Sequence, residues 1–230
     1  WSMTSKKRVL LIDALNLFMR NYIVDPSLST NGQPIGGTKG FIKSLQSVCR
    51  TISPDLIFVA WDGGSQKRKS IDKNYKAGRK PVRLNRDIHN MTAGEQEDNK
   101  NWQQERIIEY LNEMPIMQSY VENVEADDII ALVSQSQALT EHHKIILSSD
   151  KDFIQLCDDS TILYRPIQKE ILNKKRILEQ FEIHPTNFAL ARAIAGDKSD
   201  NLPGIGGAGL ATVSKRFPFL SEEKSYTIQE

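Results

Sequence analysis

The sequence predicts an α/β fold built on a mostly parallel sheet, and three observations support this fold class. Short apolar runs of strand length alternate with helical periodicity along most of the 230 residues. Three of the runs stop at or just before an aspartate, namely Asp13, Asp62 and Asp150. Open α/β sheets bind ligands beyond the carboxyl ends of their strands, so these distant acids are expected at one edge of the sheet.

The first part of the chain is expected to form two strands and two helices. Residues 8–13 predict the first strand, and helical spacing continues over 14–20. A glycine-rich turn at 31–37 precedes a second helix, for which Thr38 is the expected cap. The second strand is expected to run to Asp62.

A basic segment interrupts this pattern at 63–101, where aliphatic residues are scarce. Between Lys67 and Arg86, nine basic residues stand against one acid, Asp72. Tyr75 lies among these cations, and such a combination suits base stacking together with phosphate contact. A solvated surface run is the alternative interpretation, but the density of charge favours contact with nucleic acid.

The second half of the chain continues the alternation and ends in a glycine-rich turn. Its elements are expected to be helices at 102–114, 126–139, 174–181 and 185–195, and strands at 116–121, 144–149 and, as an edge strand, 161–164. The turn at 204–209 opens onto a helical stretch, 210–217, and would offer backbone N–H groups to a phosphate. Gly206 is expected to need a positive φ in this turn.

Charge is unevenly distributed although the net charge is only +1. Residues 1–86 contain 16 Lys and Arg against 5 Asp and Glu, whereas 87–230 contain 14 against 24. This asymmetry predicts a polyanionic partner on one side and bound cations on the other. No apolar run approaches the roughly 20 residues that cross a bilayer. Cys49 and Cys157 are too few for a disulfide framework, so an intracellular location is expected.

Nine acids form five clusters that predict a metal site. The clusters are Asp13; Asp62; Glu125, Asp127 and Asp128; Asp150 and Asp152; and Asp197 and Asp200. Helix-dipole stabilisation, helix capping and turn formation could each explain one of the pairs. Their joint occurrence beside strand ends and a glycine turn favours a cation, and an all-oxygen ligand set suits Mg²⁺ or Mn²⁺. The loop at 36–39 fails the order of a P-loop, which disfavours NTP hydrolysis.

Six ordered motifs resemble the structure-specific 5′-nuclease family. They are Leu-Ile-Asp-Ala-Leu-Asn at 11–16, Phe-Val-Ala-Trp-Asp at 58–62, Tyr-Lys-Ala-Gly-Arg at 75–79, Glu-Ala-Asp-Asp at 125–128, Ser-Asp-Lys-Asp at 149–152 and Gly-Asp-Lys-Ser-Asp-Asn-Leu-Pro-Gly at 196–204. The family includes flap endonucleases, the 5′–3′ exonuclease domain of bacterial DNA polymerase I, and phage enzymes called ribonuclease H or 5′-exonuclease. The compact size is most similar to a phage replication enzyme.

The resemblance implies a PIN-like fold with two functional regions. Residues 1–182 would form the catalytic domain, with 63–101 as a helical arch or clamp, and 183–230 would form a helix-turn-helix-type subdomain that grips duplex DNA. Two or more Mg²⁺ ions, with Mn²⁺ as a substitute, would lie between two sets of acids. The first set would be Asp13, Asp62, Glu125, Asp127 and Asp128, and the second Asp150, Asp152, Asp197 and Asp200.

The resemblance also implies roles for the basic residues and the glycines. Lys76 and Arg79 would stabilise charge on the scissile phosphate, acting with the metal-positioning acids Asp13, Asp62 and Asp150. Tyr75 would stack on an unpaired base. Other DNA contacts would come from Arg20, Lys67, Arg68, Lys69, Lys80, Arg83, Gly204, Gly206 and Gly207. A K⁺ ion often binds the glycine turn in this family, although this turn lacks the usual Gly-Ile-Gly-x-Lys pattern.

The implied activity is a two-metal flap endonuclease and 5′–3′ exonuclease that acts on branched or nicked DNA and on RNA primers. The protein would be a monomer. Its partners would be RNA–DNA hybrids and a single-strand-binding protein or a sliding clamp. A catalytically silent junction-binding module is one alternative, but it would lack some of the nine acids. A PIN-type single-strand ribonuclease is another, but such proteins generally lack the Asp-Asn-x-Pro-Gly turn found at 200–204. A haloacid-type phosphatase needs a second Asp where Leu15 stands.

Overall fold

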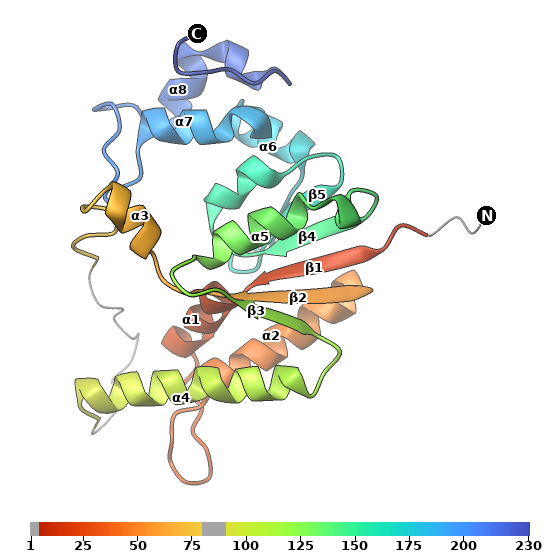
Figure 1. Ribbon diagram of the computed structural model, residues 1–230, viewed down its shortest axis with the longest axis vertical. Helices are drawn as coiled ribbons and strands as arrows, with labels where there is room; N and C mark the ends of the chain where they lie inside the picture. Colours follow the sequence, from red (N-terminus) through yellow and green to blue (C-terminus); the bar gives the residue numbers. More distant parts are fainter. Residues whose placement is uncertain (1–4, 80–90) are drawn as a thin grey trace.

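A six-stranded sheet forms the centre of the molecule (Figure 1). The computed structural model describes residues 5–79 and 91–230, without the side chain of Lys67, so the predicted DNA contacts of Lys67, Lys80 and Arg83 lie outside the described part. The strand order is β3-β2-β1-β4-β5-β6. The strands are β1 (Arg8–Asp13), β2 (Leu56–Trp61), β3 (Met117–Tyr120), β4 (His143–Leu147), β5 (Thr161–Arg165) and β6 (Glu170–Leu172).

The pairing confirms the predicted sheet type and corrects one strand. β1 to β5 are parallel, and β6 pairs antiparallel with β5. The expectation that 161–164 is an edge strand is therefore wrong, because Glu170–Leu172 covers its outer side. That strand is only three residues long, too short to show a period of two in the sequence.

Helices cover both faces of the sheet. They are α1 (Ala14–Val24), α2 (Gly36–Ile52), α3 (Gln66–Ile71), α4 (Ala93–Asn112), α5 (Ala126–Ser134), α6 (Lys174–Phe181), α7 (Phe188–Ala195) and α8 (Leu210–Arg216). Short 3₁₀ segments add η1 (Gln137–Leu139), η2 (Lys151–Leu156), η3 (Pro185–Asn187) and η4 (Pro218–Ser221). Within the described residues, none of the helices combines the length and the apolar character needed to cross a bilayer.

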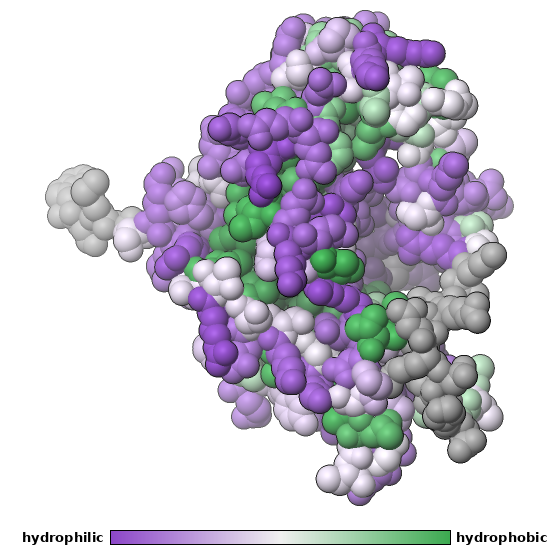
Figure 2. Space-filling model, turned by 180° about the vertical axis from the view of Figure 1, so that it is seen from behind, coloured by the Kyte–Doolittle hydropathy of each residue, from purple (hydrophilic) through white to green (hydrophobic). Residues whose placement is uncertain are grey.

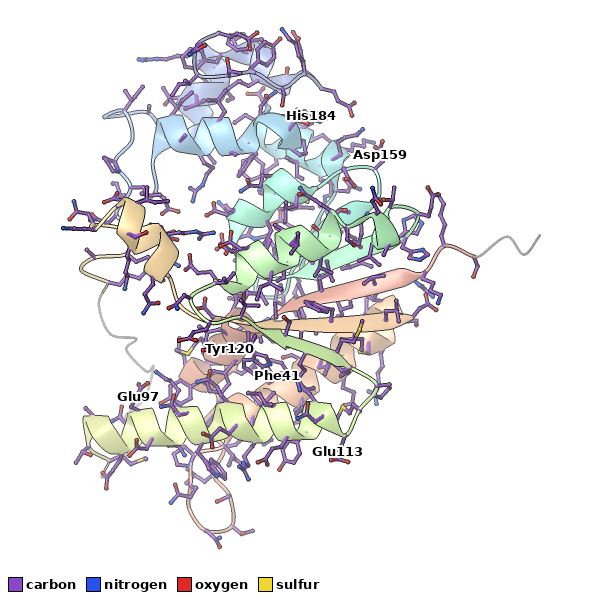
Figure 3. All side chains as sticks on the ribbon, in the orientation of Figure 1. Phe41, Glu97, Glu113, Tyr120, Asp159 and His184 are labelled. Carbon is purple, nitrogen blue, oxygen red and sulfur yellow. The ribbon has the colours of Figure 1, made fainter. Side chains whose placement is uncertain are left out.

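Two hydrophobic cores lie on opposite faces of the sheet, because side chains alternate along each strand. Leu10 and Ile12 of β1 face α1, α2 and α4, where Phe41 stacks on Trp61 with ring centroids 6.2 Å apart (Figure 3). Leu11 faces the opposite core, which packs against α5, α6 and α7. Seen from behind, the surface is mostly hydrophilic, with hydrophobic residues in separate groups (Figure 2).

Helix α4 begins well before the position that apolar periodicity indicates. Thr92 caps it, and Glu95 completes a capping box by accepting from the Thr92 N–H at 2.7 Å. Before Ile107, α4 buries Asn99 and Gln103 instead of aliphatic residues. Asn99 donates to the Pro34 carbonyl at 3.0 Å, so this part of the expected arch packs against the body of the protein.

Two other expectations about helix ends are wrong. Thr38 does not cap α2; it lies inside the helix, where its N–H donates to Gln103 Oε1 at 3.0 Å and its hydroxyl donates to the Gln103 carbonyl. These bonds attach α2 to α4. The helix expected over 126–139 stops at Ser134 and is followed by the separate 3₁₀ turn η1.

Candidate active site

The carboxyl ends of the parallel strands bring the predicted acids to one edge. Asp13 ends β1 and caps α1 by accepting from the Asn16 N–H at 3.3 Å. Its other carboxylate oxygen accepts from the Ser148 hydroxyl at 3.0 Å, just beyond the neighbouring strand β4. Asp62 follows β2 and accepts from the Gly64 N–H at 2.8 Å. The expected convergence of strand ends is thus present in the structure.

Asp13 has an unusual protonation equilibrium at this edge. Desolvation raises the pKa of its carboxyl to about 7, and the negative charges of Asp150 and Asp127 act in the same direction. Asp127 of α5 and Asp150, which precedes η2, thus lie near enough to the end of β1 to act on Asp13. A bound cation would favour the ionised form of the same carboxyl.

The first acid group consists of Glu125, Asp127 and Asp128 at the start of α5. Glu125 precedes the helix, and both aspartates lie in its first turn. Arg68 of α3 forms ion pairs with all three. Its guanidinium donates to both oxygens of Asp127 at 3.1 Å and to Asp128 at 2.8 Å. The bidentate geometry makes the contact with Asp127 the most strongly oriented of the three.

Lys76 and Tyr75 reach the same group from the segment after α3. The Lys76 ammonium pairs with Glu125. The Tyr75 hydroxyl lies 3.1 Å from Glu125 Oε2 and 3.3 Å from Asp200 Oδ2. Tyr75 is only 6% exposed, and the Lys76 ammonium lies 5.0 Å from its ring centroid. The predicted base stacking is therefore not available to Tyr75 in this arrangement.

The second acid group consists of Asp152, Asp197 and Asp200. One carboxylate oxygen of each residue lies within 4.8 Å of the other two. Among residues 5–79 and 91–230, no other three potential metal ligands lie this close together. Arg192 of α7 bonds to Asp152 at 3.0 Å and also pairs with Asp197. Asp150 caps η2 by accepting from the Asp152 N–H at 2.8 Å. Capping and the predicted metal role are compatible, because each uses one oxygen of the carboxylate.

The segment 72–79 connects the two acid groups. The Lys76 N–H donates to the Asp200 carbonyl at 2.9 Å, and Asn201 donates to the Asn74 carbonyl at 3.0 Å. Arg79 pairs with Asp200 and donates to the Ser199 carbonyl at 3.1 Å. Figure 1 shows α3 beside the loop that precedes α8. A cavity of about 400 Å³ lies here, lined by the second acid group and by Asn16, Arg79, Ser149, Asp150, Lys151, Arg165, Arg192 and Ser199.

Three site residues were not found by sequence reasoning. Arg192 was the most visible of them, since it is the single cation in the otherwise apolar sequence of α7. Arg165 ends β5, at the same edge as the acids, and donates to the Ser149 carbonyl at 3.3 Å. Ser148, which bonds to Asp13, has no distinguishing signal because serine is common after strands.

The remaining predicted DNA contacts lie outside this acid centre. Arg20 is partly buried on α1, and Lys69 is exposed on α3. Gly207 has a φ of 77°, whereas Gly206 is not among the positive-φ glycines, so the expected left-handed position is one residue later. A Cβ on Gly204 would lie 2.2 Å from the Ala195 carbonyl oxygen, so Gly204 permits close packing against the end of α7.

Comparison with known proteins agrees with this geometry. The family of the 5′–3′ exonuclease, N-terminal resolvase-like domain, matches residues 8–182. A 5′–3′ exonuclease of Buchnera aphidicola is 27% identical over 91% of this chain and 69% of its own length. A 5′–3′ exonuclease of Aquifex aeolicus is 28% identical over 90% of this chain and 67% of its own length. A thermostable DNA polymerase I of Thermus thermophilus is 29% identical over 91% of this chain but only 24% of its own length.

Solved structures show the same fold. A phage T5 5′-exonuclease with bound zinc ions superposes with a TM-score of 0.73 at 20% identity, covering 92% of this chain and 76% of that chain. The phage T5 flap endonuclease in complex with DNA and metal ions gives 0.72 at 19% identity with the same coverage. The flap endonuclease of Methanococcus jannaschii gives 0.52 at 15% identity over 94% of this chain and 75% of its own.

This chain belongs to the 5′–3′ exonuclease family, whose fold and acidic edge it contains. It is accordingly a 5′-nuclease, an enzyme that hydrolyses phosphodiester bonds. Its carboxylates fit a divalent metal ion, since hard cations prefer several oxygen ligands and the second acid group brings three together. The predicted family and PIN-like α/β fold are both confirmed.

Proposed function

We propose that this protein is a Mg²⁺-dependent, structure-specific 5′-nuclease that cleaves branched or nicked DNA with a 5′ single-stranded flap and removes RNA primers from RNA–DNA hybrids. The observation that carries this proposal is the meeting of two acid groups with Lys76 and Arg79 at one sheet edge. Negative and positive side chains alternate there, as a site for metal ions and phosphate requires.

The acids would position two Mg²⁺ ions, with Mn²⁺ as a substitute. Bound ions supply a hydroxide from water and stabilise the leaving 3′-oxygen. The first acid group, with Asp13 and Asp62, would hold one ion, and the second would hold the other. Asp150 would hold the second ion together with Asp152, whose N–H it contacts at 2.8 Å. The carboxylates would hold and orient the ions, and none of them needs to attack the phosphate.

Lys76 and Arg79 would stabilise charge on the scissile phosphate. Both cations already reach the acid groups from one segment, and Glu125 and Asp200 fix the direction of their side chains. A phosphate group entering between the two acid groups would meet both donors without a rearrangement of the backbone at 72–79. Preorganised donors of this kind contribute directly to transition-state stabilisation.

The two-domain organisation remains part of the proposal. Residues 1–182 would be the catalytic domain, with 63–101 as the arch, and 183–230 would bind duplex DNA through the turn after Asp200. The T5 relative was solved with DNA, which supports branched or nicked DNA as the substrate. A monomer is expected, and a single-strand-binding protein or sliding clamp is a proposed partner. A K⁺ ion at the glycine turn is a further, separate expectation.

The test is cleavage of a 5′-labelled flap substrate and a matched single strand, with Mg²⁺ and with EDTA. We expect Mg²⁺-dependent products of defined length from the flap substrate and much slower cleavage of the single strand. Binding of the flap without cleavage at any divalent-ion concentration would instead indicate a silent junction-binding module. Preferred cleavage of single-stranded RNA would indicate a PIN-type ribonuclease.

A further inference from the structure

Arg68 makes contacts that the proposed DNA role does not explain. Its guanidinium contacts both oxygens of Asp127, one oxygen of Asp128 and Glu125 Oε2. Lys76 takes Oε1, the other oxygen of Glu125. All four carboxylate oxygens of Glu125 and Asp127 therefore contact protein cations. A residue that contacted only phosphate groups would have no need of this geometry.

A divalent ion would need the same oxygen atoms. Mg²⁺ ligands lie at about 2.0–2.1 Å in near-octahedral geometry, so an ion held by Glu125 and Asp127 would occupy the space between them. A guanidinium bonded to both oxygens of Asp127 uses the positions from which Asp127 would coordinate. The two positive charges would also repel each other at contact distance.

The second acid group differs, because among the described residues each of its carboxylates pairs with a cation through one oxygen only, including Asp200, which pairs with Arg79 through Oδ1. Arg192 contacts Asp152 through Oδ1 and Asp197 through Oδ2, one oxygen on each. Three carboxylate oxygens of that group still lie within 4.8 Å of one another. An ion could therefore approach the second group through carboxylate oxygens that neither Arg192 nor Arg79 contacts. The difference singles out Arg68 as the cation that metal binding at the first group would have to displace.

We infer that Arg68 is an internal counter-ion that competes with a divalent cation for Glu125, Asp127 and Asp128, so that ion binding releases α3. The inference rests on the proposed metal role of the first acid group. Arg68 lies on α3, and the chain continues directly into Tyr75 and Lys76. Displacement of Arg68 would remove one hydrogen-bond donor from the Tyr75 hydroxyl, now at 3.0 Å. Ion binding and the exposure of this segment to DNA are then coupled, and each favours the other.

Binding of Mn²⁺ alone, without DNA, tests the competition. Electron paramagnetic resonance and calorimetry would compare the full chain with Arg68→Met, which keeps an apolar stem of similar length. We expect the first-group affinity for Mn²⁺ to rise by about tenfold, within the usual range of couplings between linked sites. Lys73→Met is the matched control, since Lys73 is an exposed cation of the same segment. Its Mn²⁺ affinity should change by less than about twofold, because long-range surface charge is screened.

A second variant and a second readout separate the inference from simple unfolding. Arg68→Lys keeps the charge but loses the planar fork, so its Mn²⁺ affinity should lie between those of the other two proteins. Hydrogen exchange of α3 amides should accelerate on Mn²⁺ addition to the unmodified chain and should already be fast in Arg68→Met. Equal or weaker Mn²⁺ binding by folded Arg68→Met would overturn the competition. Absence of Mn²⁺ binding in every protein, including the unmodified chain, would overturn the proposed metal site itself and this inference with it.

Discussion

The two acid groups differ in where their neutralising cations come from. Glu125, Asp127 and Asp128 all lie at one helix start and are paired with Arg68 and Lys76, which belong to the basic segment after β2. The acids of the second group come from η2 and from the turn after α7, and Arg192 of α7 joins two of them. Like charges this close require a cation in either case.

The difference indicates two kinds of preorganisation. The second group carries its cation on an element that also packs into the core beneath it, since Ala191 next to Arg192 is fully buried. Among the described cations that pair with this group, only Arg79, which pairs with Asp200, comes from the basic segment. The first group depends on α3 and 72–79 for neutralisation, so anything that moves this segment changes its electrostatics. The second group should consequently behave as the more permanent cation site, and the first as the more responsive one.

Removing one carboxylate from each group should give the largest effects. Asp127→Asn and Asp197→Asn should each lower the single-turnover cleavage rate by about 100-fold or more, because even residues behind metal ligands typically contribute about 10–100-fold. Single-turnover assays at saturating Mg²⁺ would measure the loss. Asp159→Asn is the control, since this exposed acid pairs with Lys174 far from α3 (Figure 3). Full activity of either site variant would remove that acid from the metal site.

Lys76→Ala tests the basic segment directly. If Lys76 acts on the scissile phosphate, the single-turnover rate should fall by about 10²–10³, as for other charge-stabilising donors. Binding of the flap substrate, measured by anisotropy in Ca²⁺, should change much less. Lys73→Ala, which removes an exposed cation of the same segment, should affect the two measurements only slightly. A loss of affinity without a loss of rate at saturating enzyme would make Lys76 a guide for DNA instead.

The pH dependence of metal binding should be larger at the first group, although desolvation also raises the pKa of Asp152 in the second group. Desolvation raises the pKa of Asp13 to about 7, so below that pH an ion must displace a proton from this carboxyl. First-group affinity for Mn²⁺ should therefore rise by up to about tenfold per pH unit below 7 and level off above it. Calorimetry between pH 5.5 and about 8.5 would cover both regimes. In Asp13→Asn the slope should be absent, although binding is weaker.

The same titration has a consequence for stability in EDTA. The pKa of Asp13 in the folded state is above its unfolded value, so folding favours the protonated form. The resulting stability is fully present below the unfolded pKa of about 4 and is lost as pH rises from there to about 7. Asp13→Asn should remove this contribution and flatten the pH dependence of the thermal midpoint between about pH 4 and about 7. An unchanged profile in the variant would show that Asp13 titrates at its ordinary value.

The position of the acids at one edge of the sheet could be predicted from the sequence, but the cations that neutralise them could not. Strand-end acids such as Asp13 are predictable because a buried parallel strand is a continuous apolar run and its end is marked by the first polar residue. Arg68 was expected to contact DNA, because a run of cations does not reveal which of its members turns toward the protein. Its contacts with α5 join residues more than fifty positions apart and depend on the tertiary path of the chain.

Local sequence signals also failed where polar residues occupy buried positions that apolar residues usually take. Before Ile107, α4 buries Asn99 and Gln103, whose amides bond to each other at 2.8 Å, so hydrophobic periodicity could not detect this part of the helix. The capping box at Thr92 and Glu95 was the available signal. In the glycine turn, composition indicated a positive φ but could not assign it to Gly207 in preference to Gly206.

The smallest expected effects concern that glycine turn, and they test whether it grips duplex phosphate. No heavy atom lies within 4 Å of a Cβ placed on Gly206, and its φ is not left-handed, so Gly206→Ala and Gly206→Asp should both fold normally. If backbone N–H groups here hold a phosphate, the added carboxylate of Gly206→Asp should weaken duplex binding. Loss of one phosphate contact should also make the slope of log affinity against log salt shallower by about 0.9.

Gly206→Ala and Gly207→Ala separate contact with DNA from backbone strain. Gly206→Ala adds no charge and should keep the salt slope, whereas Gly207→Ala should cost about 1 kcal/mol in stability because its φ is 77°. Anisotropy in Ca²⁺ with flapped duplex and with single strand would measure the slopes, and thermal unfolding would measure the strain. Equal salt slopes for Gly206→Asp and Gly206→Ala on the duplex would mean that the turn joins two helices without touching DNA. A shallower salt slope of Gly206→Asp on the duplex alone would support contact between this turn and DNA. The turn would then be a third region, which binds phosphate through backbone dipoles instead of side-chain cations.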